Sequence, residues 1–310
     1  MREKEFIEII KSVVGEKYIG DDCAFLQDLG ITVTQDNLVE GVHFLREKIF
    51  AYQLGWKSVA VNISDICASG AKPKYLTIGL SIPDDINDEF IKQFYNGAKN
   101  MASSANGAKI VGGDITKSDK IMISVTAIGS TKGRNISSRS NAKVGQKIVI
   151  AGEHGTSAAG LKVLIGKDLP KLSQSEKDYL VNFHNMPKPK IKFSEYIAKQ
   201  TGQSDYAMMD TSDGLADALS QISKASGVLM EIDFDKIPVS PSVKKFDNYE
   251  NLVLYGGEDY GIIATTDFSD DLYVIGEVKE GKGVKIIRKP CAEIFTADDI
   301  EKKIFQHFKE

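Results

Sequence analysis

The hydrophobic pattern alternates along the chain between two periodicities. Apolar residues three and four positions apart, as in Phe6, Ile7 and Ile10, predict helices. Helices are predicted at residues 6–14, 88–104, 157–165, 175–183, 191–198, 215–225 and 297–308, and a helix with a small-residue face at residues 50–69. Short β-branched or continuously apolar runs predict strands at residues 31–34, 75–82, 109–111, 121–128, 147–151, 206–209, 228–232, 260–264 and 272–275. Because helices and strands alternate in both halves, we expect an α/β or α+β layered fold.

A polar stretch interrupts this alternation at residues 132–146, where the apolar content drops. A chain of 310 residues is long for a single hydrophobic core and comfortable for two. Domain boundaries usually fall in polar connecting segments of this kind. We therefore expect an N-terminal domain of residues 1–135 and a C-terminal domain of residues 136–310.

Composition narrows the function classes. The chain is 42% hydrophobic and 26% charged, as is ordinary for a globular protein. The formal net charge of −4 argues against non-specific binding to nucleic acid or to an anionic membrane. Three cysteines without C-x-x-C spacing make a disulfide framework or a structural zinc site unexpected. Because we find no signal-peptide pattern and no apolar run of about 18 residues, we expect a cytoplasmic protein.

Four segments place acidic residues directly beside glycines. They are Gly20-Asp21-Asp22, Gly112-Gly113-Asp114, Asp210-Thr211-Ser212-Asp213-Gly214 and Gly257-Glu258-Asp259. Glycine lets the backbone approach a ligand closely, and a carboxylate is a hard oxygen ligand. If the four segments converge, they would hold several Mg²⁺ ions against a nucleotide triphosphate. Neither G-x-x-x-x-G-K-[ST] nor G-x-G-x-x-G occurs in the chain, so ATP binding would depend mainly on carboxylates and metal.

Two of these segments carry the strongest signal. Asp210 and Asp213 stand three residues apart at a predicted strand-to-helix junction, so both could face one metal. The first N–H groups of that helix could then meet a phosphate oxygen. The alternative is that Asp or Ser only caps the helix. Asp114 follows a predicted strand and two glycines, at a sheet edge where ligands usually bind in α/β folds.

Other polar candidates have an ordinary structural alternative. The stretch Asn62-Ile63-Ser64-Asp65 puts poor helix-interior residues inside a predicted helix, which indicates either a face turned to a ligand or a solvated helix end. Asp36 is predicted at a strand end, where a turn or cap is the usual role. His43 could be a structural histidine. Arg139 lies in the polar stretch, where it could reach a phosphate or remain solvated.

Taken in order, these residues resemble the thiamine-monophosphate kinases, a family within the aminoimidazole-ribonucleotide synthetase superfamily. The matching stretches run through nearly the whole chain, at residues 20–24, 36–44, 60–70, 111–114, 210–215 and 256–260. The pairing of residues 37–44 with Gly256-Gly257-Glu258-Asp259-Tyr260 distinguishes this family from its relatives. The resemblance implies an N-terminal α/β domain that forms the interface of a homodimer and a C-terminal α/β domain that closes the active-site cleft.

The resemblance also implies roles for individual residues. The metal-binding positions are Asp22, Thr34, Gln35, Asp36, Asp65, Asp114, Asp210 and Asp213, of which Asp114, Asp210 and Asp213 are expected to act in catalysis. The ATP-binding positions are Tyr95, Asp114, Arg139 and Ser212, and those that contact thiamine monophosphate are His43, Glu258 and Phe305. Gln35 departs from the family pattern, which has a hydroxyl residue there, and Ile115 replaces the usual threonine.

The reaction implied is transfer of the γ-phosphoryl group of ATP to thiamine monophosphate, giving thiamine diphosphate and ADP, with Mg²⁺ ions as cofactors. The acceptor is already anionic near neutral pH, because the second pKa of a phosphate monoester is about 6. No strong general base is then required. Two alternatives stay open: another ATP-using enzyme of the superfamily, such as an aminoimidazole-ribonucleotide synthetase, and a non-catalytic nucleotide- or metal-binding regulator.

Overall fold

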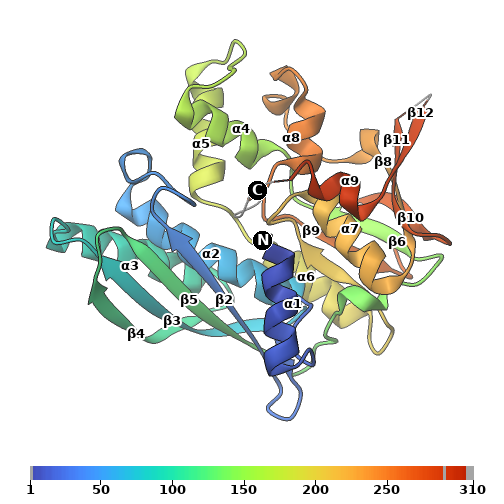
Figure 1. Cartoon of the computed structure of the whole chain (residues 1–310), viewed down its shortest axis with the longest axis horizontal. Coiled ribbons are helices and arrows are strands. Elements are labelled where there is room, and N and C mark those ends of the chain that lie inside the picture. The colour runs from blue at the N-terminus through green and yellow to red at the C-terminus, as the bar shows by residue number, and fades with distance from the viewer. Residues whose placement is uncertain (1–2, 289–290, 305–310) are drawn as a thin grey trace.

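The first half of the computed structural model, which describes residues 3–288 and 291–304, is built on a mixed five-stranded sheet (Figure 1). Its strands are β1 (Ala24–Leu26), β2 (Ile31–Val39), β3 (Lys72–Ile82), β4 (Lys109–Lys117) and β5 (Met122–Ser130), in the order β1-β2-β5-β3-β4. β3 and β4 are parallel, and the other neighbours are antiparallel. Alternate residues of β5 are buried, so one face of the sheet turns to the core.

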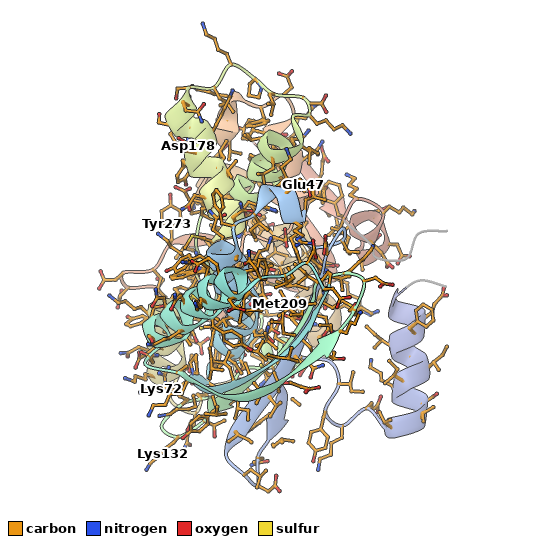
Figure 2. All side chains as sticks on the ribbon, turned by 90° about the vertical axis from the view of Figure 1, so that its left-hand side faces the viewer. Glu47, Lys72, Lys132, Asp178, Met209 and Tyr273 are labelled. Carbon is orange, nitrogen blue, oxygen red and sulfur yellow. The ribbon has the colours of Figure 1, made fainter. Side chains whose placement is uncertain are left out.

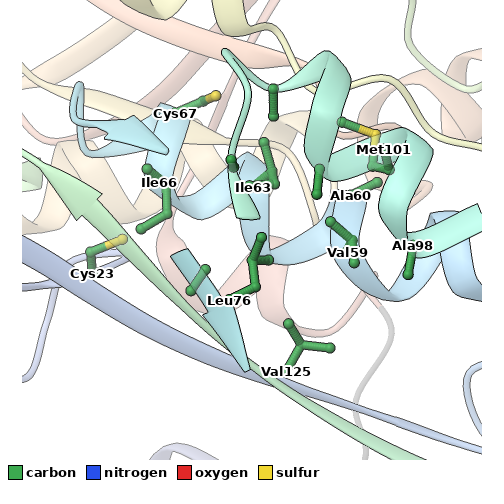
Figure 3. Close-up of a cluster of buried hydrophobic side chains, with 14 of the residues drawn as sticks. Cys23, Val59, Ala60, Ile63, Ile66, Cys67, Leu76, Ala98, Met101 and Val125 are labelled. Atoms are coloured by element: carbon green, nitrogen blue, oxygen red, sulfur yellow. The ribbon is translucent and has the colours of Figure 1, made fainter. Parts of the chain in front are cut away.

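Two helices cover that face, α2 (Ala51–Ala68) and α3 (Asp88–Ser104). Figure 3 shows side chains of the cluster that they form with the sheet, including Ile63 and Ile66 of α2, Leu76 of β3 and Val125 of β5. Most of α2 is buried, because the sheet lies on one side of it and the second half of the chain on the other. The helix is therefore a shared core element of both halves.

The two helices approach each other through glycines. A Cβ atom on Gly55 would lie 1.9 Å from the carbonyl oxygen of Phe94, and one on Gly97 would lie 1.9 Å from that of Tyr52. Any larger residue would force the helices apart, because real Cβ atoms do not come so close. The small residues of the predicted 50–69 helix thus serve packing against α3.

The second half of the chain forms a seven-stranded sheet in the order β12-β11-β8-β10-β6-β9-β7. Its strands are β6 (Lys147–Ala151), β7 (Met208–Asp210), β8 (Leu229–Asp233), β9 (Ile262–Thr266), β10 (Val274–Lys279), β11 (Gly283–Arg288) and β12 (Cys291–Phe295). Its helices are α4 (Thr156–Ile165), α5 (Gln174–Asn185), α6 (Ile191–Gln200), α7 (Leu215–Ser226), α8 (Tyr249–Tyr255) and α9 (Ala297–Glu301). A second hydrophobic core lies between this sheet and helices that include α4 and α7. The molecule is therefore mixed α/β with two sheets.

Within the described part of the chain, helix α1 and four short 3-10 helices complete the structure. Helix α1 (Glu3–Val14) stands at the margin of the molecule (Figure 2), and its residues Ile9, Ile10, Val13 and Val14 are exposed. Four short 3-10 helices occur at Arg46–Lys48 (η1), Arg139–Asn141 (η2), Phe234–Lys236 (η3) and Val243–Lys245 (η4). Within the described ranges, none of the helices combines the length and the apolar character that crossing a bilayer requires.

The structure corrects several of the predicted elements. The strand predicted at residues 31–34 continues to Val39, because it pairs with β5 along its whole length, so Asp36 lies inside a strand and not at its end. The strand predicted at residues 109–111 continues through Gly112-Gly113-Asp114 to Lys117, alongside β3. Elements β1, α8, β11 and β12 are absent from the prediction. The terminal helix α9 ends at Glu301, and the final part of the predicted segment lies outside the described residues.

Candidate active site

Three carboxylates from distant parts of the chain meet between the two halves. Asp22 precedes β1, Asp65 lies in the last turn of α2, and Asp210 ends β7. Each offers an oxygen atom, and these oxygens all lie within 4.8 Å of one another. We call this group the carboxylate trio. An all-oxygen donor set of this kind fits Mg²⁺, which prefers carboxylate ligands.

The polar stretch of α2 faces this trio. The hydroxyl of Ser64 donates to Oδ2 of Asp210 (2.6 Å), and the amide oxygen of Asn62 accepts from the backbone N–H of Asp36 (2.9 Å). The hydroxyl of Thr34 donates to Oδ2 of Asp65 (2.6 Å). Asn62 and Ser64 are completely buried, which excludes the alternative of a solvated helix end. These contacts place Thr34 and Asp36 of β2 beside the trio.

Burial and mutual repulsion make the carboxylates hard to ionise. Burial, more than the neighbouring charges, raises the pKa of Asp22 to about 6 and that of Asp36 to about 6. The pKa of Asp65 lies well above its usual value, first because of burial and then because of Asp36 and Asp210. Burial also raises the pKa of Asp210. Such a site gains free energy when a cation neutralises it.

Arg139 provides a cation at the trio. Its Nη2 lies 3.0 Å from Oδ1 of Asp22, and its Nη1 donates to Oε1 of Gln221 (2.5 Å). Its backbone N–H donates to Oδ1 of Asp21 (2.7 Å). Arg139 is thus held at the carboxylates by the Gly20-Asp21-Asp22 segment, although the sequence alone left a solvated role open. Its Nε is buried without a hydrogen-bond partner.

The segment Asp210–Gly214 carries a second group of predicted residues. The backbone N–H of Ser212 donates to Oδ1 of Asp210 (3.2 Å), which bends the segment back on itself. The N-cap of α7 is Gly214, so neither Asp210 nor Ser212 occupies the capping position, and the capping alternative is wrong for these two residues. Asp213 is exposed and lies outside the trio.

Several predicted residues lie away from the trio. Asp114 is exposed on the edge strand β4, which β5 and β3 separate from β2. Tyr95 lies on α3, where its ring packs edge-on against Phe94 at 5.3 Å between centroids. The amide oxygen of Gln35 accepts from the hydroxyl of Thr126 (2.9 Å). The structure gives these three residues no contact with the carboxylates.

Three residues are expected to contact the acceptor: His43, Glu258 and Phe305. Nδ1 of His43 accepts from the backbone N–H of Val39 (3.0 Å), and the imidazole is near enough to Glu258 to help lower the pKa of that carboxyl group. Glu258 pairs with Lys57 (3.1 Å), a buried lysine of α2 that sequence reasoning missed. Its signal was a charged residue within a helix of small and apolar neighbours. Phe305 lies outside the described residues.

A cavity of about 870 Å³ opens beside Asp22. Its lining combines the Gly20-Asp21-Asp22 segment with the polar Ser137 and Ser138 and the apolar or aromatic Tyr18, Phe25 and Ile136. Ligand pockets for small molecules have this size and this mixture of apolar walls with a few polar groups. The cavity and the trio therefore share Asp22.

Comparison with known proteins identifies the family. Residues 20–131 match the AIR synthase related protein, N-terminal domain, and residues 143–289 match its C-terminal domain. The thiamine-monophosphate kinase of Aquifex aeolicus is 34% identical over 99% of this chain and 100% of that protein, and the one of Bacillus subtilis is 33% identical over 94% and 93%. A solved structure of AaThiL complexed with AMPPCP and TMP has a TM-score of 0.85 at 32% identity, covering 99% of this chain and 97% of that one. The chain therefore belongs to the AIR synthase related proteins and, among them, to the thiamine-monophosphate kinase family.

Proposed function

We propose that this protein transfers the γ-phosphoryl group of ATP to the phosphate of thiamine monophosphate, giving thiamine diphosphate and ADP. The observation that carries the proposal is the carboxylate trio of Asp22, Asp65 and Asp210, in a chain of the thiamine-monophosphate kinase family. The related structure of AaThiL is a complex with AMPPCP and TMP, an ATP analogue and an acceptor. The donor and acceptor proposed here have the same chemistry.

The reaction requires charge neutralisation more than proton transfer. The acceptor phosphate already carries its attacking charge, because the second pKa of a phosphate monoester is about 6. The obstacle is repulsion between two polyanions and the charge spread over the transferring group. Arg139, held 3.0 Å from Asp22, is placed to stabilise that charge. The cavity beside Asp22 has room for the nucleoside of ATP, with Tyr18 and Phe25 among its walls.

Mg²⁺ is the cofactor we propose. When bound, it supplies the positive charge that offsets both phosphate chains and keeps them in line. The proposed ligands are Asp22, Thr34, Gln35, Asp36, Asp65, Asp114, Asp210 and Asp213. The support is strongest for Asp22, Asp65 and Asp210, whose oxygens already converge. For Asp114 and Gln35 it rests on the family resemblance.

Three further features belong to this proposal. We place the domain boundary between residues 135 and 136, in the polar stretch between β5 and β6. The protein is expected to work as a cytoplasmic homodimer whose interface is formed by the N-terminal domain. In support of that interface, Val111 and Ile115 of β4 and Met122 of β5 expose their apolar side chains.

The direct test is to incubate the purified protein with ATP, thiamine monophosphate and MgCl₂ and to quantify thiamine diphosphate and ADP. Equal amounts of both products are expected. The same mixture without metal should give neither. A folded protein that binds ATP but forms no thiamine diphosphate would contradict the proposal and point to another acceptor or to a regulator.

A further inference from the structure

A buried ion pair joins the two halves of the chain next to the candidate active site. The side chain of Lys57 on α2 is 0% exposed, and its Nζ lies 3.1 Å from Oε1 of Glu258, in the segment between α8 and β9. The ammonium makes no well-aligned hydrogen bond, so the contact is ionic. Lysine is almost never fully buried unless it is paired. What needs an explanation beyond packing is therefore why the chain buries a charged pair at this place.

Glu258 is held from three sides. Its Oε1 faces Lys57, its Oε2 lies 3.5 Å from Nδ1 of His184, and its backbone N–H donates to the carbonyl of Ser212 (2.6 Å). The same Nδ1 lies closer to the hydroxyl of Ser157, at 2.9 Å, and burial lowers the pKa of His184 to about 4, so its ring is neutral near pH 7 and is the weaker of these contacts. Glu258 also has a φ of +65°, a conformation that costs energy outside glycine and persists where the surrounding structure enforces it. Its carboxylate consequently has one fixed orientation.

The position of the pair relative to the trio suits an acceptor. Ser64, which donates to Asp210, follows Lys57 by seven residues on the same helix. Seven residues are about two turns of α-helix, so the two side chains share a face and lie about 10 Å apart along the axis. Through Ser212, the backbone of Glu258 also contacts the segment that carries Asp210. If the phosphate of a small acceptor lies at the trio, the rest of the molecule can extend along α2 towards Lys57 and Glu258.

The pair contributes little that a hydrophobic contact could not supply. A buried ion pair loses in desolvation much of what it gains in attraction, so it is weak evidence for a stabilising role. Its clear effect is on Glu258. Burial raises the pKa of this carboxyl group, but Lys57 first, and His184 and His43 after it, more than offset the effect, so the pKa lies below its usual value. Glu258 is also the partly exposed member of the pair, with 27% of its side chain accessible.

We propose that Lys57 is a positioning residue for the acceptor: it fixes Glu258 in the orientation that receives the cationic ring of thiamine monophosphate. The inference rests on the proposed function, which supplies this acceptor. Lys57 itself touches no substrate, because its side chain is inaccessible. It acts through Glu258, and it does so from the other half of the chain, so the acceptor site is complete only when α2 and the second half are together.

The test is the Lys57→Met variant, which keeps the length of the side chain and removes its charge. The matched control is Arg134→Met, since Arg134 is also a buried cation between the two halves, 4% exposed and 3.1 Å from Glu195. The KM for thiamine monophosphate, the KM for ATP and kcat would be measured for both variants. We expect Lys57→Met to raise the KM for thiamine monophosphate by about tenfold or more, as the loss of one charge-assisted contact does, and to leave the KM for ATP unchanged. Arg134→Met should change neither KM.

A double-mutant cycle separates positioning from a general structural role. In a Glu258→Gln background, Lys57→Met should add little to the KM for thiamine monophosphate, because its target is already lost. Equal rises in both KM values, or an undiminished effect in the Glu258→Gln background, would overturn the inference. If Lys57→Met does not fold, Lys57→Gln, which also removes the charge, takes its place and predicts the same split. If the wild-type protein forms no thiamine diphosphate, the proposed function itself is overturned. If the wild type is active and Lys57→Met has an unchanged KM for thiamine monophosphate, only this inference is overturned.

Discussion

The carboxylate trio is suited to binding a ligand and lowers the stability of the fold. It consists of Asp22, Asp65 and Asp210. Their oxygens lie within 4.8 Å of one another. Burial and mutual repulsion raise the pKa of each carboxyl group. Arg139 pairs with Asp22 at 3.0 Å, but this one guanidinium cannot neutralise three carboxylates. Sites that hold like charges together in this way are kept for function at a cost in stability.

We therefore predict opposite effects of Asp65→Asn on stability and on activity. In the presence of a chelator, the amide removes repulsion from the trio, and Tm should rise by about 2–4 °C for each ~1 kcal/mol gained. Turnover of ATP and thiamine monophosphate with Mg²⁺ should fall by about a hundredfold or more, as the loss of an electrostatic contact at the reacting group does. Differential scanning fluorimetry and product quantification measure the two effects.

The control for this variant is Asp119→Asn, an exposed aspartate between β4 and β5. It should change neither Tm nor turnover. A lower Tm for metal-free Asp65→Asn would mean that Thr34, which donates to Asp65, stabilises the carboxylate more than its neighbours destabilise it. That result would contradict the view that the trio is strained without a cation.

At the residue scale, the sequence named the candidates but not their convergence. Glycines beside carboxylates indicated Asp22 and Asp210, and poor helix formers inside a helix indicated Asp65. Whether these residues meet depends on contacts between α2, β7 and the segment before β1, which no local pattern encodes. The role of Lys57 could not be predicted for the same reason, because its partner Glu258 lies far away in sequence.

The element that organises the molecule is α2, which presents a different kind of residue on each side. Ile63 and Ile66 pack on the first sheet, Asp65 belongs to the trio with Ser64 beside it, and Gly55 lies against α3. A helix with three such faces has little tolerance for rotation. Close packing against α3 therefore also fixes the direction in which the polar face points.

This reasoning predicts that Gly97→Ala destabilises the protein. The new Cβ would lie 1.9 Å from the carbonyl oxygen of Tyr52 on α2, so the helices must move apart. Overpacking of this kind costs about 1–3 kcal/mol of unfolding free energy, even though alanine has the better helix propensity. Urea unfolding followed by circular dichroism measures the change. Lys99→Ala, an exposed site on the same helix, is the control and should have little effect.

A stability of Gly97→Ala equal to that of the wild type would show that α3 can shift at no cost. In that case the direction of the polar face of α2 could not depend on this crossing. The kcat of the variant adds a second readout, because a displaced α2 would also move Asp65 relative to Asp22 and Asp210.

At the element scale, long periodic segments were predictable and short ones were not. The helices α3 and α7 were found because their apolar residues repeat over several turns, and α2 because small residues recur along it. Helix α8 and strand β1 span only seven and three residues, too few for a period to show. Strand β4 was cut short in the prediction because glycines at residues 112 and 113 suggest a turn, whereas pairing with β3 keeps them extended.

At the scale of the whole molecule, the two sheets are separate but the site belongs to both halves. The trio takes Asp22 and Asp65 from the first half and Asp210 from the second. A cation bound there would link the two halves directly. Its effect should therefore appear in the stability of the whole chain, since a ligand that binds only the folded state stabilises it by mass action.

The last prediction concerns the pH dependence of that effect. Asp22 and Asp36 have a pKa of about 6 in the folded chain, against about 3.9 for an unfolded aspartate. A group whose pKa is raised on folding contributes stability that is complete below about pH 4 and is lost as the pH rises through about 6. Metal-free protein should thus lose this contribution over the same interval in which the carboxylates become able to bind Mg²⁺.

We therefore expect MgCl₂ to raise Tm little near pH 5 and increasingly up to about pH 7, where the increase should level off. Thermal unfolding with MgCl₂, against KCl of equal ionic strength, isolates binding from screening of surface charge. The Asp65→Asn variant should show a smaller rise at every pH, because one ligand is missing and less repulsion remains to be relieved. An increase in Tm that is the same at both ends of the range would mean that Mg²⁺ binds to groups other than Asp22 and its neighbours.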